Sequence, residues 1–362
     1  MGKCYLILEN GRVFEGVRFG AEKDVVAEIA FTTGVGGYLE TLSDKSFHGQ
    51  AVVQTFPVIG NYGVIPSDFE SEGVQVAAYI VREVCDTPSN FRSEGTVREL
   101  LEKSGVPGVM GVDTRAVTRI IREQGAMNVM ICSELPADMD AALEKIKSYK
   151  VKGAVAAVSC GEKYDVKPEK RARFHVAMID YGLKQNILRE LLKRGCRVTV
   201  FPQSATAKEV MAAKPDGIML SNGPGDPKDN PEAIKALAEI SKSGVPVFAI
   251  CLGHQLFALA NGFTSEKLKY GHRGENQPVR CEKNGRVYVT SQNHGYAIIK
   301  TDKSAAVSSY WTNENDGTVE GMYYKDIPAL TVQFHPEACG GPHDTEFLFD
   351  EFIAMMNEKK SK

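Results

Sequence analysis

The sequence has no long apolar run and no excess of charge of one sign. Its longest apolar run, 245–252, contains Pro246 and is far shorter than the roughly 20 residues that a membrane-spanning helix needs. The 43 Lys and Arg residues nearly balance the 46 Asp and Glu residues, and the net charge of -3 argues against nucleic acid or a membrane as a partner. The apolar stretch after Lys3 ends at Glu9, too soon for a secretory signal, so we expect a cytoplasmic location.

Paired cysteine motifs and nucleotide-binding motifs are missing as well. The eight cysteines are scattered without a C-x-x-C pair, which argues against a zinc knuckle or a disulfide framework. Most of them are expected to be small buried hydrophobic residues. Neither G-x-x-x-x-G-K-[ST] nor G-x-G-x-x-G occurs, so the sequence gives no place for ATP chemistry in this chain.

The first half of the chain has the pattern of an α+β domain. At 362 residues, with 43% hydrophobic and 25% charged residues, the chain is long enough for two or three ordinary folded domains. Two apolar runs around Asn10-Gly11 predict a β-hairpin. Within the domain expected at 1–150, the patterns predict strands and then helices, with Asp113 as the N-cap of the last helix. The strands are expected at 51–56 and 74–84, and the helices at 97–103 and 114–124.

The second half changes rhythm and predicts a parallel sheet. Residues 151–172 lose the regular pattern and are interpreted as an interdomain linker. In the domain expected at 173–362, short buried strands alternate with helices, which is typical of a parallel α/β sheet with ligands at the carboxyl ends of its strands. The strands are expected at 174–179, 196–201, 217–220 and 246–250, and the helices at 183–194, 208–213 and 231–242.

Cys251 stands where a parallel strand passes directly into an apolar helix. A sharp turn at this point exposes the sulfur, and the helix N-terminus favours the thiolate over the thiol. The alternative is a buried structural cysteine, which is the commoner role for a cysteine chosen at random. The strand-to-helix context favours the nucleophile.

His335 is the best candidate for the base that such a nucleophile needs. It follows the strand expected at 329–334 and so emerges on the same rim as Cys251. Glu337 lies two residues further on, placed to hold the imidazole through its carboxylate. A His-Pro-Glu triplet alone is more often a surface turn. His254, the rival base, has no obvious orienting acid and is interpreted as a packing residue.

The glycine-rich loop at 221–227 also follows a predicted strand. Its backbone N–H groups, free of Cβ bulk, suit donation to an oxyanion, and the N–H of Leu252 is the natural second donor. A tight turn closing a βα connection is the alternative for a lone Gly-Pro-Gly.

Together these motifs resemble class I, triad-type glutamine amidotransferases, specifically the small subunit of carbamoyl-phosphate synthetase. The resemblance rests on 250–255, His335-Pro336-Glu337 and the loop at 222–225, and extends to 271–279 and 291–296. The first half adds Phe31-Thr32-Thr33-Gly34, 56–63 and 111–119, so the resemblance covers nearly the whole chain. It implies a flavodoxin-like amidotransferase domain preceded by the small-subunit α+β domain.

The resemblance also implies roles for individual residues. Cys251 would attack the carboxamide of L-glutamine to give a glutamyl thioester and ammonia, His335 would transfer protons and Glu337 would orient it. The residues that match the family's glutamine-binding positions are Ser46, Gly223, Gly225, Leu252, Gln255, Asn293, Gly295 and Tyr296.

The partner implied by the resemblance is a large synthetase subunit, in a heterodimer or a higher assembly. That subunit would use bicarbonate, ATP and Mg²⁺ to make carbamoyl phosphate, and no cofactor or metal is expected in this chain. Both arginine and pyrimidine synthesis stay open as destinations of the product.

The alternative functions for this chain are a glutaminase serving anthranilate or guanylate synthesis, a catalytically silent binding subunit, and a γ-glutamyl peptidase. The additional domain expected at 1–150 argues against a glutaminase of another pathway. The presence of both Cys251 and His335 argues against a silent subunit. A peptidase need not retain Gln255 and the 293–295 segment.

Overall fold

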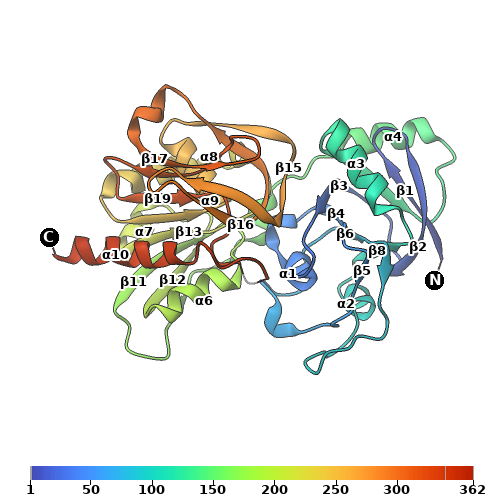
Figure 1. Cartoon of the computed structure of the whole chain (residues 1–362), viewed down its shortest axis with the longest axis horizontal. Coiled ribbons are helices and arrows are strands. Elements are labelled where there is room, and N and C mark those ends of the chain that lie inside the picture. The colour runs from blue at the N-terminus through green and yellow to red at the C-terminus, as the bar shows by residue number, and fades with distance from the viewer. Residues whose placement is uncertain (1, 339, 362) are drawn as a thin grey trace. The chain divides into compact units, whose positions relative to one another are not determined.

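The computed structural model describes residues 2–338 and 340–361, and the chain divides into two compact units, Met1–Lys152 and Gly153–Lys362 (Figure 1). Seven cysteines of the described residues are free thiols, and five of them are buried, as expected from their scatter. Cys339 lies outside the described residues. Among the described residues, none of the helices combines the length and the apolar character that crossing a lipid bilayer requires.

A closed β-barrel forms the core of the first unit. The expected hairpin is present, with Ile7 opposite Val13, and the turn uses Gly11 at a φ of 82°. Parallel and antiparallel pairings then close the barrel, an arrangement that the sequence patterns did not predict. In order around the barrel the strands are β1 (Lys3–Leu8), β2 (Val13–Gly20), β8 (Pro107–Met110), β6 (Ala78–Ile80), β4 (Gln50–Gln54), β3 (Val25–Thr32) and β9 (Met127–Cys132).

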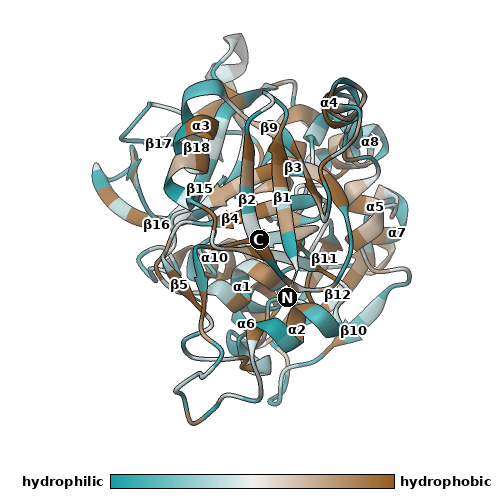
Figure 2. Cartoon of the chain, turned by 90° about the vertical axis from the view of Figure 1, so that its right-hand side faces the viewer, coloured by the Kyte–Doolittle hydropathy of each residue, from teal (hydrophilic) through white to brown (hydrophobic). Residues whose placement is uncertain are grey.

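The helices of this unit begin at local capping signals. In α2 (Val97–Lys103), Thr96 and Glu99 form a reciprocal capping box, and in α3 (Thr114–Gln124) the Asp113 carboxylate accepts from the backbone N–H of Ala116 at 2.9 Å. Both helices have the predicted bounds. Figure 2 shows hydrophilic and hydrophobic segments alternating around α3. The remaining helices are α1 (Tyr38–Ser43) and α4 (Met139–Ser148).

The strand predicted at 74–84 is wrong in extent. The structure divides it into β6, which lies in the barrel, and β7 (Glu83–Val84), which pairs with β5 (Val58–Ile59) in a separate two-stranded sheet. The sequence predicts a single strand because the run is mainly apolar. The division into two strands depends on their pairing partners, which lie in different sheets.

A ten-stranded sheet forms the second unit, and its parallel strands have the flavodoxin-like order. Numbered along the chain, these five strands run 2-1-3-4-5 across the sheet, the order typical of flavodoxin-like folds. In sheet order they are β12 (Cys196–Pro202), β11 (Phe174–Asp180), β13 (Gly217–Leu220), β14 (Val247–Ile250) and β19 (Ala329–Val332). The fold class expected from the sequence is therefore confirmed.

Antiparallel strands extend this sheet beyond β19. The longest pair is β15 (Thr264–Cys281) with β16 (Arg286–Ile299), whose register shifts twice along its length. The sheet is completed there by β18 (Val319–Tyr324) and β17 (Val307–Asn313). No strand was predicted in this part of the sequence, although it carries residues of the site described below.

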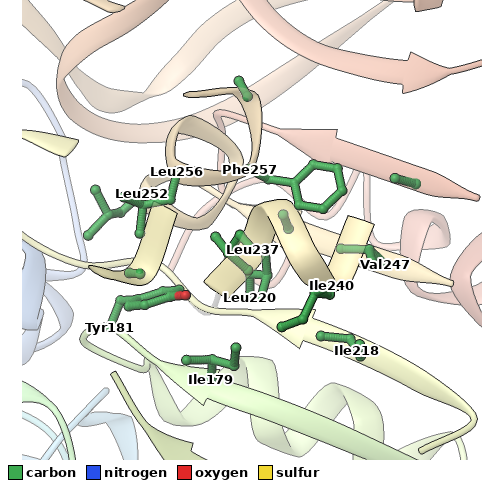
Figure 3. Packing of buried hydrophobic residues seen from close by; sticks show 14 of the residues in the cluster. Ile179, Tyr181, Ile218, Leu220, Leu237, Ile240, Val247, Leu252, Leu256 and Phe257 are labelled. Atoms are coloured by element: carbon green, nitrogen blue, oxygen red, sulfur yellow. The ribbon is translucent and has the colours of Figure 1, made fainter. Parts of the chain in front are cut away.

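Helices cover both faces of the parallel strands. Along β11, Ala177 and Ile179 pack into one buried cluster and Val176 and Met178 into the other, as the period-two alternation of a strand requires. The first cluster joins the strands to α7 (Ala207–Ala212), α8 (Pro231–Ile240) and α9 (Leu252–Ala260), and Figure 3 shows its packing. The second cluster joins them to α6 (Gln185–Lys193) and α10 (Phe347–Ser361).

The segment expected as an interdomain linker, 151–172, contains regular structure. It holds α5 (Ala154–Val158), whose Val155 joins the first buried cluster of the second unit, and β10 (Tyr164–Val166), which pairs antiparallel with β12. Apart from residues 151 and 152, the segment is therefore part of the second unit. Both elements are too short to show a clear period in the sequence.

Candidate active site

Cys251 occupies a strained turn between β14 and α9. Its backbone has a φ of 53° and a ψ of -108°, a conformation that side-chain-bearing residues rarely adopt. The turn is held because the Cys251 N–H donates to the carbonyl of Val332 at 2.8 Å and the Gly253 N–H donates to Ser221 at 3.1 Å. The thiol lies at the N-terminus of α9, where the helix dipole favours a negative sulfur.

His335 reaches the same place from the neighbouring strand. Strands β14 and β19 are parallel, with Ile250 opposite Val332, so their carboxyl ends lie side by side. Cys251 is one residue beyond the first end, and His335 is three residues beyond the second. The His335 backbone is fixed by a hydrogen bond from its N–H to the Ser291 carbonyl at 2.9 Å. The sheet topology thus brings together residues 84 positions apart, the difference between 335 and 251.

Glu337 holds the imidazole of His335. Its Oε1 lies 2.6 Å from Nδ1 of His335, and both side chains are almost completely buried. The other ring nitrogen, Nε2, has no hydrogen-bond partner of full geometric quality within the described part of the chain. The Cys251 sulfur is nevertheless near enough to the ring to raise its pKa.

These contacts set the protonation of the imidazole. Burial is the largest influence on the pKa of His335 and lowers it, as does the positive charge of Lys184. The carboxylate of Glu337 and the nearby Cys251 sulfur outweigh both, and the pKa is raised to about 9. For Glu337, burial acts to raise the pKa, but the attraction of His335 and Lys184 prevails and lowers it. An imidazolium between the Cys251 sulfur and the Glu337 carboxylate is therefore the favoured form at neutral pH.

The pH dependence of glutamine hydrolysis follows from this arrangement. Because the imidazolium stabilises the thiolate, we expect kcat/KM to fall as the pH rises through about 9, where His335 loses its proton. In Glu337→Gln the charge that raises this pKa is gone, so the fall should move to lower pH, and kcat should drop by about 10²-fold. A pH profile of both enzymes measures this. Glu351→Gln, a control that removes a carboxylate bound to Tyr323, should keep the wild-type profile. An unmoved alkaline limb in Glu337→Gln would contradict the assignment.

The glycine-rich loop lies against the first turn of α9. A Cβ atom on Gly223 would come within 2.2 Å of the Tyr181 carbonyl oxygen and 2.8 Å of a methyl group of Leu252, so only glycine fits. The loop is tied down at Ser221, whose hydroxyl accepts from the Tyr181 N–H at 2.9 Å. Gly225 has a φ of 89°, which also favours glycine. This packing places Gly223, one predicted oxyanion donor, against the side chain of Leu252, the residue that carries the other.

Three of the predicted glutamine-binding residues lie on β16, beside the thiol. The carbonyl of Asn293 lies 3.8 Å from the Cys251 sulfur, and Gly295 and Tyr296 follow on the same strand. From α9, Gln255 donates through Nε2 to the Tyr296 carbonyl at 2.8 Å. Ser46 lies in the first unit, in a short 3-10 helix whose N-cap is Asp44, and its contact with glutamine stays a prediction.

His254, the rival base, points into the core instead. It is fully buried, its Nδ1 lies 2.8 Å from the Thr331 hydroxyl, and burial lowers its pKa to about 3. A permanently neutral ring in this position packs the helix against the sheet, as expected from the sequence.

Other residues near the triad were not predicted. Lys184 follows β11, and its Nζ lies 3.8 Å from Oε1 of Glu337. Asn186 donates through its side chain to the Glu337 carbonyl. Burial raises the pKa of Glu275 to about 7, against the lowering influence of Lys184. Lys184 could have been suspected, because it is a polar residue just beyond the carboxyl end of a parallel strand.

Comparison with known proteins defines the class of this site. The family model described as "Glutamine amidotransferase class-I" matches residues 177–355, which include all the residues of the triad and the glycine-rich loop. The second unit is thus a class I glutamine amidotransferase domain. A solved structure, that of a glutamine amidotransferase from Thermotoga maritima, is 19% identical and covers 53% of this chain and 87% of its own, with a TM-score of 0.35.

The first unit and the whole-length relatives define the family. The model described as "Carbamoyl-phosphate synthase small chain, CPSase domain" matches residues 6–131. The carbamoyl phosphate synthase small chain of Bacillus caldolyticus is 48% identical over 99% of this chain and 98% of its own length. The carbamoyl phosphate synthase small chain of Clostridium perfringens is 47% identical over 97% of this chain and 99% of its own length. The chain therefore belongs to the carbamoyl phosphate synthase small chain family.

Proposed function

We propose that this chain is the glutamine-hydrolysing subunit of a carbamoyl phosphate synthase and that Cys251, His335 and Glu337 carry out the hydrolysis. The observation that carries the proposal is the strained turn at Cys251 beside an imidazole held 2.6 Å from a buried carboxylate. A nucleophile, a proton carrier and an orienting acid in this arrangement are suited to acyl transfer. The similarity to small chains over the whole length favours this function over a glutaminase of another synthetase.

The first half-reaction forms a thioester. In the resting enzyme the proton of Cys251 already resides on His335, and the thiolate attacks the side-chain carbonyl carbon of L-glutamine, forming a C–S bond and an oxyanion. The imidazolium then gives its proton to the amide nitrogen as the C–N bond breaks, and ammonia leaves. A γ-glutamyl thioester remains on Cys251.

The second half-reaction restores the enzyme. Neutral His335 takes a proton from a water molecule that attacks the thioester carbon, and glutamate leaves as the C–S bond breaks. The proton stays on the ring, and the released thiolate pairs with the imidazolium as in the resting enzyme. Throughout, the Glu337 carboxylate keeps Nδ1 protonated and Nε2 directed to the reacting atoms.

Backbone and side-chain groups around the sulfur bind the substrate in this proposal. The N–H groups of Gly223 and Leu252 donate to the oxyanion, which preorganised donors stabilise strongly. The glutamine itself is bound by residues on the glycine loop, α9 and β16, with Ser46 contributed by the first unit. These binding residues are Ser46, Gly223, Gly225, Leu252, Gln255, Asn293, Gly295 and Tyr296.

The partner in this proposal is the large subunit of the synthase. The relatives are named small chains, which implies a larger chain beside them. The large subunit would hold ATP and Mg²⁺ and would use bicarbonate and the ammonia released here, in a heterodimer or higher assembly in the cytoplasm. Ammonia in neutral water is mostly protonated and not nucleophilic, which gives a physical reason to pass it directly between the two subunits.

A test of this function compares the chain with and without its large subunit. We expect the isolated chain to convert glutamine to glutamate and ammonia slowly, and the rate to rise on addition of the large subunit with bicarbonate and ATP. A coupled assay for glutamate measures both rates, with asparagine as the control substrate. No glutamate release in the complex would refute the proposed function, and equal rates with and without the large subunit would refute the coupling.

A further inference from the structure

His272, His294 and Glu320 form a buried cluster that includes a residue of β16, the strand that carries three of the predicted glutamine-binding residues. Their ligand atoms all lie within 4.8 Å of one another, and they come from β15, β16 and β18. The two histidines are directly opposite in the register of β15 and β16, with ring centroids 4.9 Å apart. Glu320 is fully buried. None of the three belongs to the proposed triad.

His272 is held between two carboxylates. Its Nδ1 lies 3.1 Å from Oε1 of Glu320, and its Nε2 lies 2.9 Å from Oδ2 of Asp316. Since an ionised carboxylate only accepts hydrogen bonds, a ring with protons on both nitrogens satisfies both contacts. The ring is thus an imidazolium without a free lone pair, which makes the cluster a buried ion pair rather than a metal site. Burial opposes this charge, but the two carboxylates outweigh it and raise the pKa of His272.

Glu320 also faces the second histidine. Its Oε1 accepts from the side chains of Asn313 at 3.1 Å and Thr318 at 3.2 Å. Its Oε2 lies 3.9 Å from Nε2 of His294 and has no hydrogen-bond partner among the described residues. The carboxylate therefore connects β15, β17 and β18, and it holds His272 edge-to-face against the ring of His294 on β16, with ring centroids 4.9 Å apart.

His294 transmits this order to the predicted glutamine-binding residues. Its Nδ1 donates to the Tyr296 carbonyl at 2.8 Å, the same oxygen that accepts from Gln255, and its Nε2 lies 3.0 Å from Oε1 of Gln292. On the other side, the carbonyl of its neighbour Asn293 lies 3.8 Å from the Cys251 sulfur. A shift of the His294 ring would also move Asn293 and Tyr296, because the three residues lie on one short stretch of β16.

We propose that the ion pair of His272 and Glu320 is a positioning device for glutamine: it fixes the ring of His294 and so the shape of the 293–296 segment. This inference rests on the proposed function. Without the negative charge of Glu320, the 293–296 segment loses its support from β15 and β18. The residues that bind glutamine are then less well positioned. Because the side chains of this segment bind the substrate and transfer no proton, we expect a loss of their positioning to act mainly on KM.

The test is the Glu320→Gln variant in the assembled synthase. The substituted amide side chain fills the same volume and can still accept a hydrogen bond from Asn313, but it lacks the negative charge that holds His272. We expect KM for glutamine to rise about tenfold while kcat changes by less than about threefold. Glu314→Gln is the matched control: it makes the same change at a carboxylate paired with Arg280 at the surface, and KM should stay at the wild-type value. Ammonia-dependent synthesis should be unchanged in both variants.

The outcomes separate this inference from the function on which it rests. A wild-type complex without glutaminase activity refutes the proposed function. An active wild type with an unchanged KM in Glu320→Gln overturns the positioning role. If that variant does not fold, Asp316→Asn, which removes only the outer, partly exposed carboxylate, should raise KM about threefold, and an unchanged KM there overturns it too. One equivalent of zinc bound by the wild type and lost in Glu320→Gln would also contradict the ion pair.

Discussion

Replacing Cys251 by serine is expected to abolish glutamine-dependent carbamoyl phosphate synthesis by the assembled synthase. The serine hydroxyl is far less acidic than the thiol, so neither the helix N-terminus nor His335 can make it a nucleophile at neutral pH. We expect kcat for glutamine hydrolysis to fall by about 10³-fold or more. Synthesis from added ammonium chloride should stay at the wild-type rate, because the variant removes only the source of ammonia. Both activities can be measured as carbamoyl phosphate formed per minute.

A second cysteine of the same unit supplies the control. Cys160 is a partly buried cysteine that forms no disulfide and has no part in the proposed triad, and Cys160→Ser should keep both activities. Loss of the ammonia-dependent rate in Cys251→Ser would show that the residue supports the fold or the assembly. Retention of the glutamine-dependent rate would show that the sulfur is not the nucleophile.

Replacing His335 by asparagine is expected to have an effect of similar size. Asparagine keeps a polar group near Glu337 but can neither accept the thiol proton nor deliver a proton to the leaving nitrogen. Both half-reactions slow, and we expect glutaminase kcat to fall by about 10³-fold. The thiol should also react more slowly with iodoacetamide at neutral pH, because the imidazolium that stabilises the thiolate is lost. Rapid-quench assays of glutamate release and alkylation kinetics measure the two effects.

An exposed histidine gives the matched control for this variant. The His343 side chain is 66% exposed and lies 3.9 Å from Glu346, so His343→Asn should change neither rate. Unchanged alkylation in His335→Asn, together with normal glutamine hydrolysis, would remove His335 from the mechanism.

Local signals made much of the fold predictable. The helices α2 and α3 have the predicted bounds because their caps, at Thr96 and Asp113, are set by residues within one turn. The parallel strands were found because each is a short apolar run beside a helix. Closure of the barrel and the extension of the sheet by β15 and β16 were not predicted, since they depend on pairings between distant segments and on register shifts that carry no local pattern.

The site divides in the same way. Cys251 and His335 were predictable because the carboxyl ends of parallel strands meet at one edge of the sheet. Two residues that each follow such a strand in the sequence are therefore expected to lie close together in the fold. The contact of Lys184 with Glu337 and the pairing of His272 with Glu320 depend on side-chain directions in the folded protein. For Ser46 the sequence offers only the family resemblance, because its own neighbourhood resembles an ordinary loop.

The most direct test of the central claim is mass spectrometry of the enzyme quenched in acid during turnover of L-glutamine. The account predicts that one γ-glutamyl group is attached, that digestion places it on the peptide containing Cys251, and that it disappears once the glutamine is consumed. An adduct on another residue, or full turnover with no adduct on Cys251 at any quench time, would contradict it.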